Sequence, residues 1–144
     1  MDISPEFQIK ASLKSGSVYY FEDNSLTSIE PHYFVVLNHD PSNDFLLLLV
    51  CSSSQIDKVR IRNKNNPSTT LVEITPKDYP DFTKDSIIDC NKVFPRSVND
   101  LVNKLKQGKL KLKSELSANI VNRLQQGVLD SSMVEESLKR ILRQ

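Results

Sequence analysis

The sequence predicts an α+β domain in which a strongly bent antiparallel sheet, or a small barrel, is followed by helices at one end. Two patterns support this fold class. Short stretches rich in β-branched and aromatic residues alternate with polar turns up to residue 96, and from Ser97 onward apolar residues recur at helical spacing. A chain of 144 residues can bury the core of one domain, so a second full domain is not expected.

The first strands of the sheet are expected at residues 16–21 (GSVYYF), 33–37 (YFVVL) and 45–51 (FLLLLVC). The first stretch follows a turn-like Lys-Ser-Gly and is rich in residues that favour strands. The other two enclose a turn sequence with asparagine, aspartate and proline, which predicts a hairpin. Polar residues on both sides of FLLLLVC indicate a strand buried on both faces, at the centre of the sheet.

Further strands are expected later in the chain. Residues 56–61 (IDKVRI) alternate between apolar and polar, and 70–74 (TLVEI) follow a turn-rich segment, so these two stretches predict a second hairpin. Residues 86–94 (SIIDCNKVF) are expected to form one strand. Residues 109–113 (KLKLK) predict a short edge strand whose lysines keep other chains from pairing with it.

The helices predicted after residue 96 have recognisable starts and stops. They are Ser97 and Gly108 for the first helix, Ser114 and Gly127 for the second, and Ser132 with Glu135, as a capping box, for the last. In each helix the apolar residues fall on one face, so each helix is expected to cover the core. For the last helix, a dimer interface and a surface for a partner are the alternatives.

Charge and composition exclude several classes of function. With 19 Lys+Arg and 18 Asp+Glu, the net charge indicates neither a nucleic-acid nor a membrane partner. The longest apolar run is too short to cross a bilayer and no secretory leader is recognised, so a cytoplasmic location is expected. Cys51 and Cys90 are expected as core thiols, and no His or Cys spacing predicts a metal or another cofactor. Residues 1–13 have no clear period and are expected as an N-terminal arm, either loose or added for expression.

Polar residues gather at three places in the predicted sheet. Pro31-His32 precedes the second strand, a serine run from Ser52 follows the third, and Asp89 to Lys92 lies inside the stretch 86–94. Each has an ordinary explanation, namely an edge histidine, a serine turn and a backbone-bonding carboxylate. The sequence has no glycine-rich phosphate loop and no hydrolase motif. Taken singly, these places leave the function open.

The order of these places resembles that in the PemK/MazF family of toxin endoribonucleases. The matching stretches are GSVYYF, PHYFVVLN, LLLLVCSSSQ, SIIDCNKVF and SELSANIVNRL, which follow one another between residues 14 and 126. The resemblance implies a small SH3-like, strongly bent antiparallel barrel over residues 14–127, with a C-terminal helical extension at 128–144. It also implies a homodimer that a partner antitoxin neutralises.

Toxins of this family cut single-stranded RNA without a metal, through attack of the ribose 2′-hydroxyl on the adjacent phosphate. This chemistry requires a base, an acid and donors for the charge on the phosphate. The resemblance gives His32 the acid or base role, because imidazole titrates near neutral pH. Ser52 and Ser53 would donate to a phosphate oxygen, Lys92 would offset its charge, and Asp89 would orient the histidine or the 2′-hydroxyl.

The chain departs from the family pattern at two positions. His32 stands where the family has an arginine, and Ile87 stands where some members have another. Arginine is always charged and can bind a phosphate through two N–H donors at once. Because it is absent at both positions, two alternatives to a nuclease stay open. One is a non-catalytic module that binds nucleic acid or protein, and the other is a toxin that poisons a protein target.

Basic residues recur at every second position after the third predicted strand. On one strand face and the following loop they would form a patch that tracks an RNA backbone, made of Lys58, Arg60, Arg62 and Lys64. Tyr33 is a candidate for base stacking. A solvated strand face explains the same pattern equally well. The expected ligand is single-stranded RNA.

Overall fold

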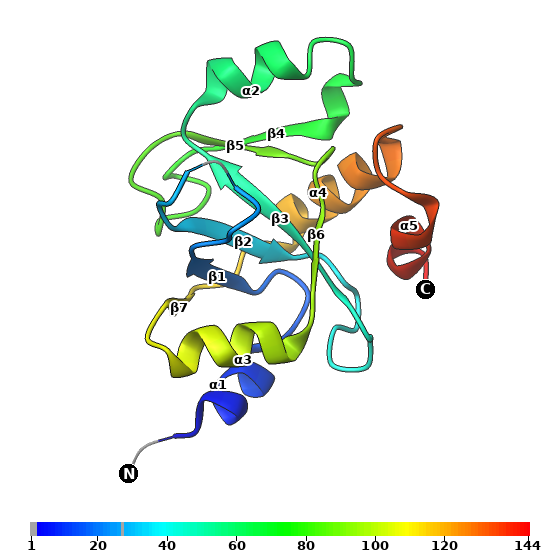
Figure 1. Cartoon of the computed structure of the whole chain (residues 1–144). Helices are drawn as coiled ribbons and strands as arrows, with labels where there is room; N and C mark the ends of the chain where they lie inside the picture. Colours follow the sequence, from blue (N-terminus) through cyan, green and yellow to red (C-terminus); the bar gives the residue numbers. More distant parts are fainter. Residues whose placement is uncertain (1–2, 27) are drawn as a thin grey trace.

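The computed structural model describes residues 3–26 and 28–144, which form an α+β domain (Figure 1). Its strands are β1 (Val18–Phe21), β2 (His32–Val36), β3 (Leu47–Ser53), β4 (Leu71–Ile74), β5 (Ser86–Asp89), β6 (Phe94–Arg96) and β7 (Leu110–Lys113). Its helices are α1 (Pro5–Ser12), α2 (Ile56–Arg62), α3 (Val98–Lys106), α4 (Ala118–Asp130) and α5 (Glu136–Leu142). A short 3₁₀ turn, η1 (Ser68–Thr70), precedes β4.

The strands form one antiparallel sheet, and the described strands do not close into a barrel. The order is β4-β5-β3-β2-β1-β7, and β6 also pairs with β3. Strand β3 lies between β5 and β2 in this order. Its first residues pair with β6, and its last residues, Ser52 and Ser53, pair with β5. The ends of β2, β3 and β5 therefore meet in one region.

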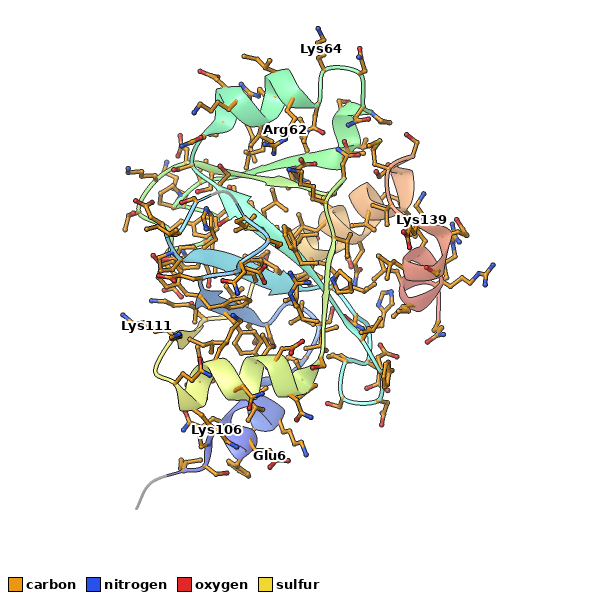
Figure 2. All side chains as sticks on the ribbon, viewed as in Figure 1. Glu6, Arg62, Lys64, Lys106, Lys111 and Lys139 are labelled. Carbon is orange, nitrogen blue, oxygen red and sulfur yellow. The ribbon has the colours of Figure 1, made fainter. Side chains whose placement is uncertain are left out.

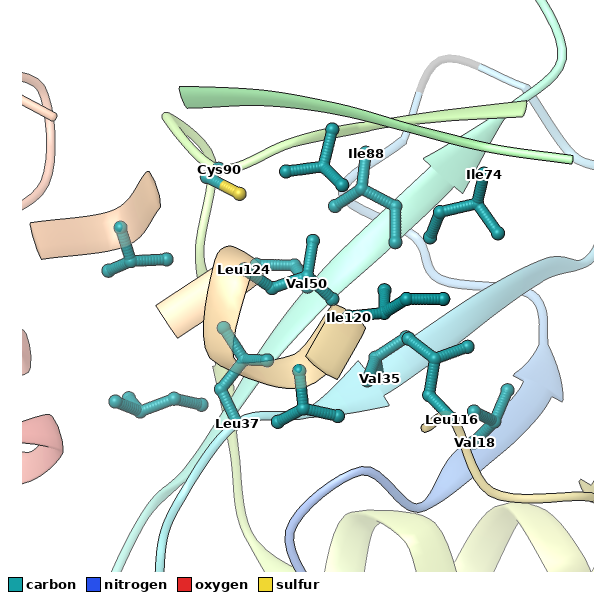
Figure 3. Packing of buried hydrophobic residues seen from close by; sticks show 14 of the residues in the cluster. Val18, Val35, Leu37, Val50, Ile74, Ile88, Cys90, Leu116, Ile120 and Leu124 are labelled. Atoms are coloured by element: carbon teal, nitrogen blue, oxygen red, sulfur yellow. The ribbon is translucent and has the colours of Figure 1, made fainter. Parts of the chain in front are cut away.

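Each face of the sheet has its own apolar core. The side chains of β3 alternate between the two, so Leu48 and Val50 enter the first core while Leu47 and Leu49 enter the second. Helices α4 and α5 cover the first core, in which Val50, Ile88 and Leu124 are packed together (Figure 3). Helices α1 and α3 cover the second core. The predicted burial on both faces is confirmed from Leu47 to Val50, whereas Phe45, at the start of the predicted stretch, is 94% exposed and precedes the strand.

Several predicted elements are confirmed nearly as expected. The stretches that become β1, β2, β3 and β4 are strands, β2 and β3 form the expected hairpin, and β7 is an edge strand. Helix α3 begins with a capping box between Ser97 and Asp100. The chain leaves α3 through Gly108, whose φ of 71° is a left-handed conformation that favours glycine.

The strand predicted at residues 56–61 is wrong, because these residues form α2. Val59 is the buried residue of this helix, whereas Ile61 is 71% exposed and belongs to no strand face. The charges also fit a helix, with Asp57 in the first turn and Arg60 and Arg62 in the last, where the helix dipole favours them. No hairpin therefore joins this stretch to β4.

The single strand predicted at residues 86–94 is also wrong. The Asp89 carboxylate accepts a hydrogen bond from the Asn91 backbone N–H at 2.9 Å, which is the pattern of an Asx turn. The Lys92 N–H then bonds to the Asp89 carbonyl. This turn divides the stretch into β5 and β6, which pair with opposite ends of β3.

Three predicted boundaries of the C-terminal helices are wrong. Ser114 caps no helix but bonds to Asp81, and α4 begins after Ser117. Gly127 lies inside α4, where a Cβ atom would come within 2.8 Å of the Cys90 sulfur, so the glycine permits close packing. Helix α5 begins after Glu135 without a side-chain cap.

The two ends of the described chain pack against the sheet. Helix α1 has Ser4 as its N-cap and buries Ile9, so residues 4–12 are not a loose arm. Helix α5 covers the first core with Leu142, as expected for an amphipathic helix at this position.

Candidate functional site

A hollow of about 550 Å³ lies where the ends of β2, β3 and β5 meet. Its walls come from the β1–β2 connection, from α2 and from residues 82–84. The five residues predicted as catalytic, His32, Ser52, Ser53, Asp89 and Lys92, all line it. Of the residues predicted to bind RNA, Tyr33, Lys58 and Arg62 line the hollow. The three polar places found in the sequence thus share one site.

The His32 side chain is half-buried at the start of β2, and its ring orientation is fixed by one hydrogen bond. Its Nδ1 lies 2.8 Å from the carbonyl oxygen of Glu30. A carbonyl can only accept, so Nδ1 carries the proton and Nε2 is the acceptor in the neutral ring. Within the described residues Nε2 has no hydrogen-bond partner, and it is therefore the atom of His32 that can take a proton from a ligand.

The end of β3 presents serine hydroxyls and a thiol. Neighbouring strand residues point to opposite faces, so Ser53 shares a face with Cys51 while Ser52 faces the other way. The Ser53 hydroxyl accepts from the Gln55 N–H, whereas the nearly buried Ser52 hydroxyl has no partner among the described residues. Burial, together with the nearby Asp23, raises the pKa of Cys51 to about 12, so its thiol is not a nucleophile at neutral pH.

The Asp89 carboxylate is buried and fully hydrogen-bonded. One oxygen accepts from Arg62 at 3.2 Å and Asn63 at 3.0 Å, and the other accepts from the Asn91 backbone and side chain. Asn91 bonds in addition to Thr70 and Ser131. The predicted pairing of Asp89 with His32 is therefore not present, and the ordinary interpretation of a backbone-bonding carboxylate is the one observed.

The hollow is locally cationic in a nearly neutral protein. Lys58, Arg62, Lys84 and Lys92 line it, against the acidic Glu30 and Asp89. Lys58 and Arg62 are four residues apart on α2, so they lie on the same side of the helix. In Figure 2 Arg62 lies on the side of α2 that faces the sheet, whereas Lys64 points away from it.

The predicted basic strand face is wrong, because α2 distributes these residues around a helix. Arg60 forms an ion pair with Glu73 of β4 and does not line the hollow. Lys64 follows the end of the helix and is exposed. Two of the four predicted basic residues therefore remain at the site.

An aromatic wall closes one side of the hollow. Tyr20 and Tyr33 are cross-strand partners whose ring centroids are 4.6 Å apart, and Phe82 packs on the Tyr33 ring at 4.9 Å. The Tyr33 hydroxyl donates to the Asp81 carbonyl at 3.0 Å, which fixes the ring. Tyr33 is thus a rigid, half-buried surface beside His32.

The loop between β1 and β2 is held by an ion pair that the sequence did not reveal. Arg96 donates through two nitrogens to Asp23, at 2.8 and 3.0 Å, and Ser25 donates to the same carboxylate. Burial would raise the pKa of Asp23, but these hydrogen bonds outweigh it and lower the pKa to about 2. The pair joins residues 73 positions apart, so no local pattern could show it.

No cluster of three or more metal-ligating side chains occurs among residues 3–26 and 28–144. In the same part of the chain, none of the helices has the length and apolar character needed to cross a membrane. Comparison with protein-family models and with curated proteins finds no match for this chain.

Proposed function

We propose that this protein is a metal-independent endoribonuclease that cleaves single-stranded RNA, as a toxin of the PemK/MazF type. The observation that supports it most is the orientation of His32. Its Nδ1 is held by the Glu30 carbonyl, so Nε2 is left as an acceptor in a hollow lined by four cationic side chains. A base beside a cationic surface suits a substrate with a hydroxyl next to a phosphate.

In the proposed reaction, Nε2 of His32 takes the proton of the 2′-hydroxyl. The 2′ oxygen bonds to phosphorus, the bond from phosphorus to the 5′ oxygen breaks, and the leaving oxygen takes a proton from water. The hydroxide left behind takes the proton held on Nε2, which restores neutral His32. The cations of the hollow offset the charge on the phosphate, and Ser53 donates to one of its oxygens. Tyr33 offers a stacking surface for a base. The products are a 2′,3′-cyclic phosphate and a 5′-hydroxyl.

The proposal also includes what the family resemblance implies beyond the site. The part of the sheet around β3 would correspond to the SH3-like barrel, and the protein would act in the cytoplasm as a homodimer controlled by an antitoxin. A non-catalytic RNA-binding module is the second candidate. It is favoured by the engagement of Asp89 with Arg62, Asn63 and Asn91, which leaves His32 without this carboxylate as a partner in proton transfer.

The test is cleavage of a mixed-sequence RNA by the purified protein in EDTA. His32→Ala should lower the rate by about a hundredfold or more, the usual contribution of a general base. His39→Ala is the matched control, because His39 is the second histidine of the chain and lies outside the hollow. A substrate with 2′-deoxyribose should not be cut. Wild-type protein that binds RNA without cutting it would favour the second candidate, and cleavage unaffected by His32→Ala would overturn the assigned base.

A further inference from the structure

We propose that Arg62 is the phosphate-binding fork of the hollow and that Asp89 is the positioning residue that holds it there. Arginine is missing at both positions where the family resemblance places one, namely at His32 and Ile87. Helix α2 brings a different arginine to the same hollow. The site would thus obtain its phosphate fork from an element that the family motif does not include.

Among the described residues, Arg62 is the cation that contacts Asp89. Asp89 is 6% exposed, and its other donors, from Asn63 and Asn91, are neutral. The attraction between the carboxylate and the guanidinium restrains Arg62 in the position in which the two groups are in contact. The restraint uses one arginine nitrogen, Nη2.

The rest of the Arg62 guanidinium stays available for a ligand. Its side chain is 48% exposed, and within the described part of the chain it bonds only to Asp89. A guanidinium has five N–H donors, so a phosphate can be bound beside the existing ion pair. Lys58 lies one turn before Arg62 on α2, and Lys92 lines the hollow from the turn that follows Asp89. The three cations could therefore contact one phosphate group or two neighbouring ones.

This inference rests on the proposed function for the nature of its ligand, but its test requires no cleavage. The probe is a fluorescent 2′-O-methyl RNA, which lacks the attacking hydroxyl, and binding is measured by fluorescence anisotropy. Arg62→Ala should weaken binding about tenfold or more, the usual effect of losing a charge-assisted contact. Arg62→Lys should fall between wild type and Arg62→Ala, because the charge is kept and the fork is lost. Arg123→Ala, on the exposed side of α4, should bind as wild type does.

Two further readouts separate positioning from a general effect on folding. Arg62→Ala should reduce the slope of log affinity against log salt by about 0.7, as expected for one lost phosphate contact on a single strand. Asp89→Asn should weaken binding about fivefold on its own, yet by less than about twofold in the Arg62→Ala background, because Asp89 acts through that arginine. Circular dichroism checks each fold, and Asp89→Glu replaces Asp89→Asn if the latter unfolds.

The outcomes distinguish this inference from the proposed function. Binding by Arg62→Ala within twofold of wild type would overturn the inference even if the protein cuts RNA. Losses that multiply in the double variant would overturn the positioning role of Asp89. A wild-type protein that binds the methylated RNA but cleaves no RNA would contradict the nuclease proposal and leave the phosphate fork intact. Absence of any binding would overturn both.

Discussion

Two aspartate–arginine pairs near the hollow have the same chemistry and different surroundings. Arg96 contacts Asp23 through two nitrogens, lies over the Phe94 ring and is 23% exposed. Arg62 contacts Asp89 through one nitrogen and is 48% exposed. Both aspartates are buried. The difference is therefore in the arginine, which is enclosed in one pair and open to a ligand in the other.

The two arginines therefore suit different roles. Arg96 holds the site together, and Arg62 is the candidate for contacting a ligand. The Arg96 guanidinium also bonds to Pro95 and Ser25, so its donors are used within the protein. It fixes the β1–β2 connection, which forms one wall of the hollow. The Arg62 guanidinium lies on the wall formed by α2 and has donors that are not used within the described residues. Exposure of the cation, rather than burial of the acid, is thus the property that marks a candidate ligand-binding arginine.

The largest expected effect is the loss of stability in Arg96→Ala. This change leaves the buried Asp23 without its bidentate partner, and breaking such a pair costs about 3 kcal/mol or more. The free energy of unfolding, measured by urea denaturation, should fall by that amount. Asp23→Asn in the same chain should recover part of the loss, because it removes the unpaired charge. A loss below about 1 kcal/mol would show that the pair does not hold the loop.

The second prediction concerns acid. The folded-state pKa of Asp23, about 2, lies below its ordinary value of 3.8, so the pair stabilises fully above pH 4 and loses this effect as the pH falls through 2. The shift corresponds to about 2 kcal/mol. Asp23→Asn should remove that part of the acid-induced loss. Stability curves of wild type and variant that stay parallel between pH 5 and pH 2 would contradict the prediction.

Most of the fold could be predicted because short-range signals set it. Apolar runs between polar turns predicted the strands, and Ser97 as a cap with Gly108 as the stop predicted α3. The prediction failed at α2, where six residues fit both a strand and a helix, and at Gly127, where the reason for glycine is contact with Cys90. Such tertiary contacts leave no pattern in the neighbouring sequence.

The candidate site was predicted in part for a similar reason. Polar residues at strand ends are visible in the sequence, and adjacent strands bring His32, Ser53 and Asp89 to one hollow. The partners of each side chain could not be predicted. Asp89 bonds to Arg62, 27 positions away, instead of His32. Hydrogen-bond partners depend on side-chain direction, which the order of motifs along the chain does not contain.

A third prediction concerns the hydrogen bonds that hold Asp89 through Asn91 and Ser131. The buried Ser131 hydroxyl donates to the Asn91 side-chain oxygen at 2.6 Å, and Asn91 in turn bonds to Asp89. Ser131→Ala should lower the free energy of unfolding by about 1 kcal/mol, since a buried acceptor loses its donor. Ser132→Ala, at the exposed neighbouring position, is the control and should change it by less than about 0.5 kcal/mol. Equal losses in both variants would contradict a role for this hydrogen bond.

The smallest expected effect on stability is that of Arg62→Ala. Its guanidinium makes one contact of 3.2 Å at a half-exposed position, and Asp89 keeps the donors of Asn63 and Asn91 when it is gone. The free energy of unfolding should therefore fall by about 1 kcal/mol or less, because the pair is one contact to a cation that water also solvates. Urea denaturation of Arg62→Ala beside Arg96→Ala makes the comparison direct. A loss in Arg62→Ala as large as that in Arg96→Ala would mean that both arginines hold the fold, and that Arg62 is not free to serve a ligand.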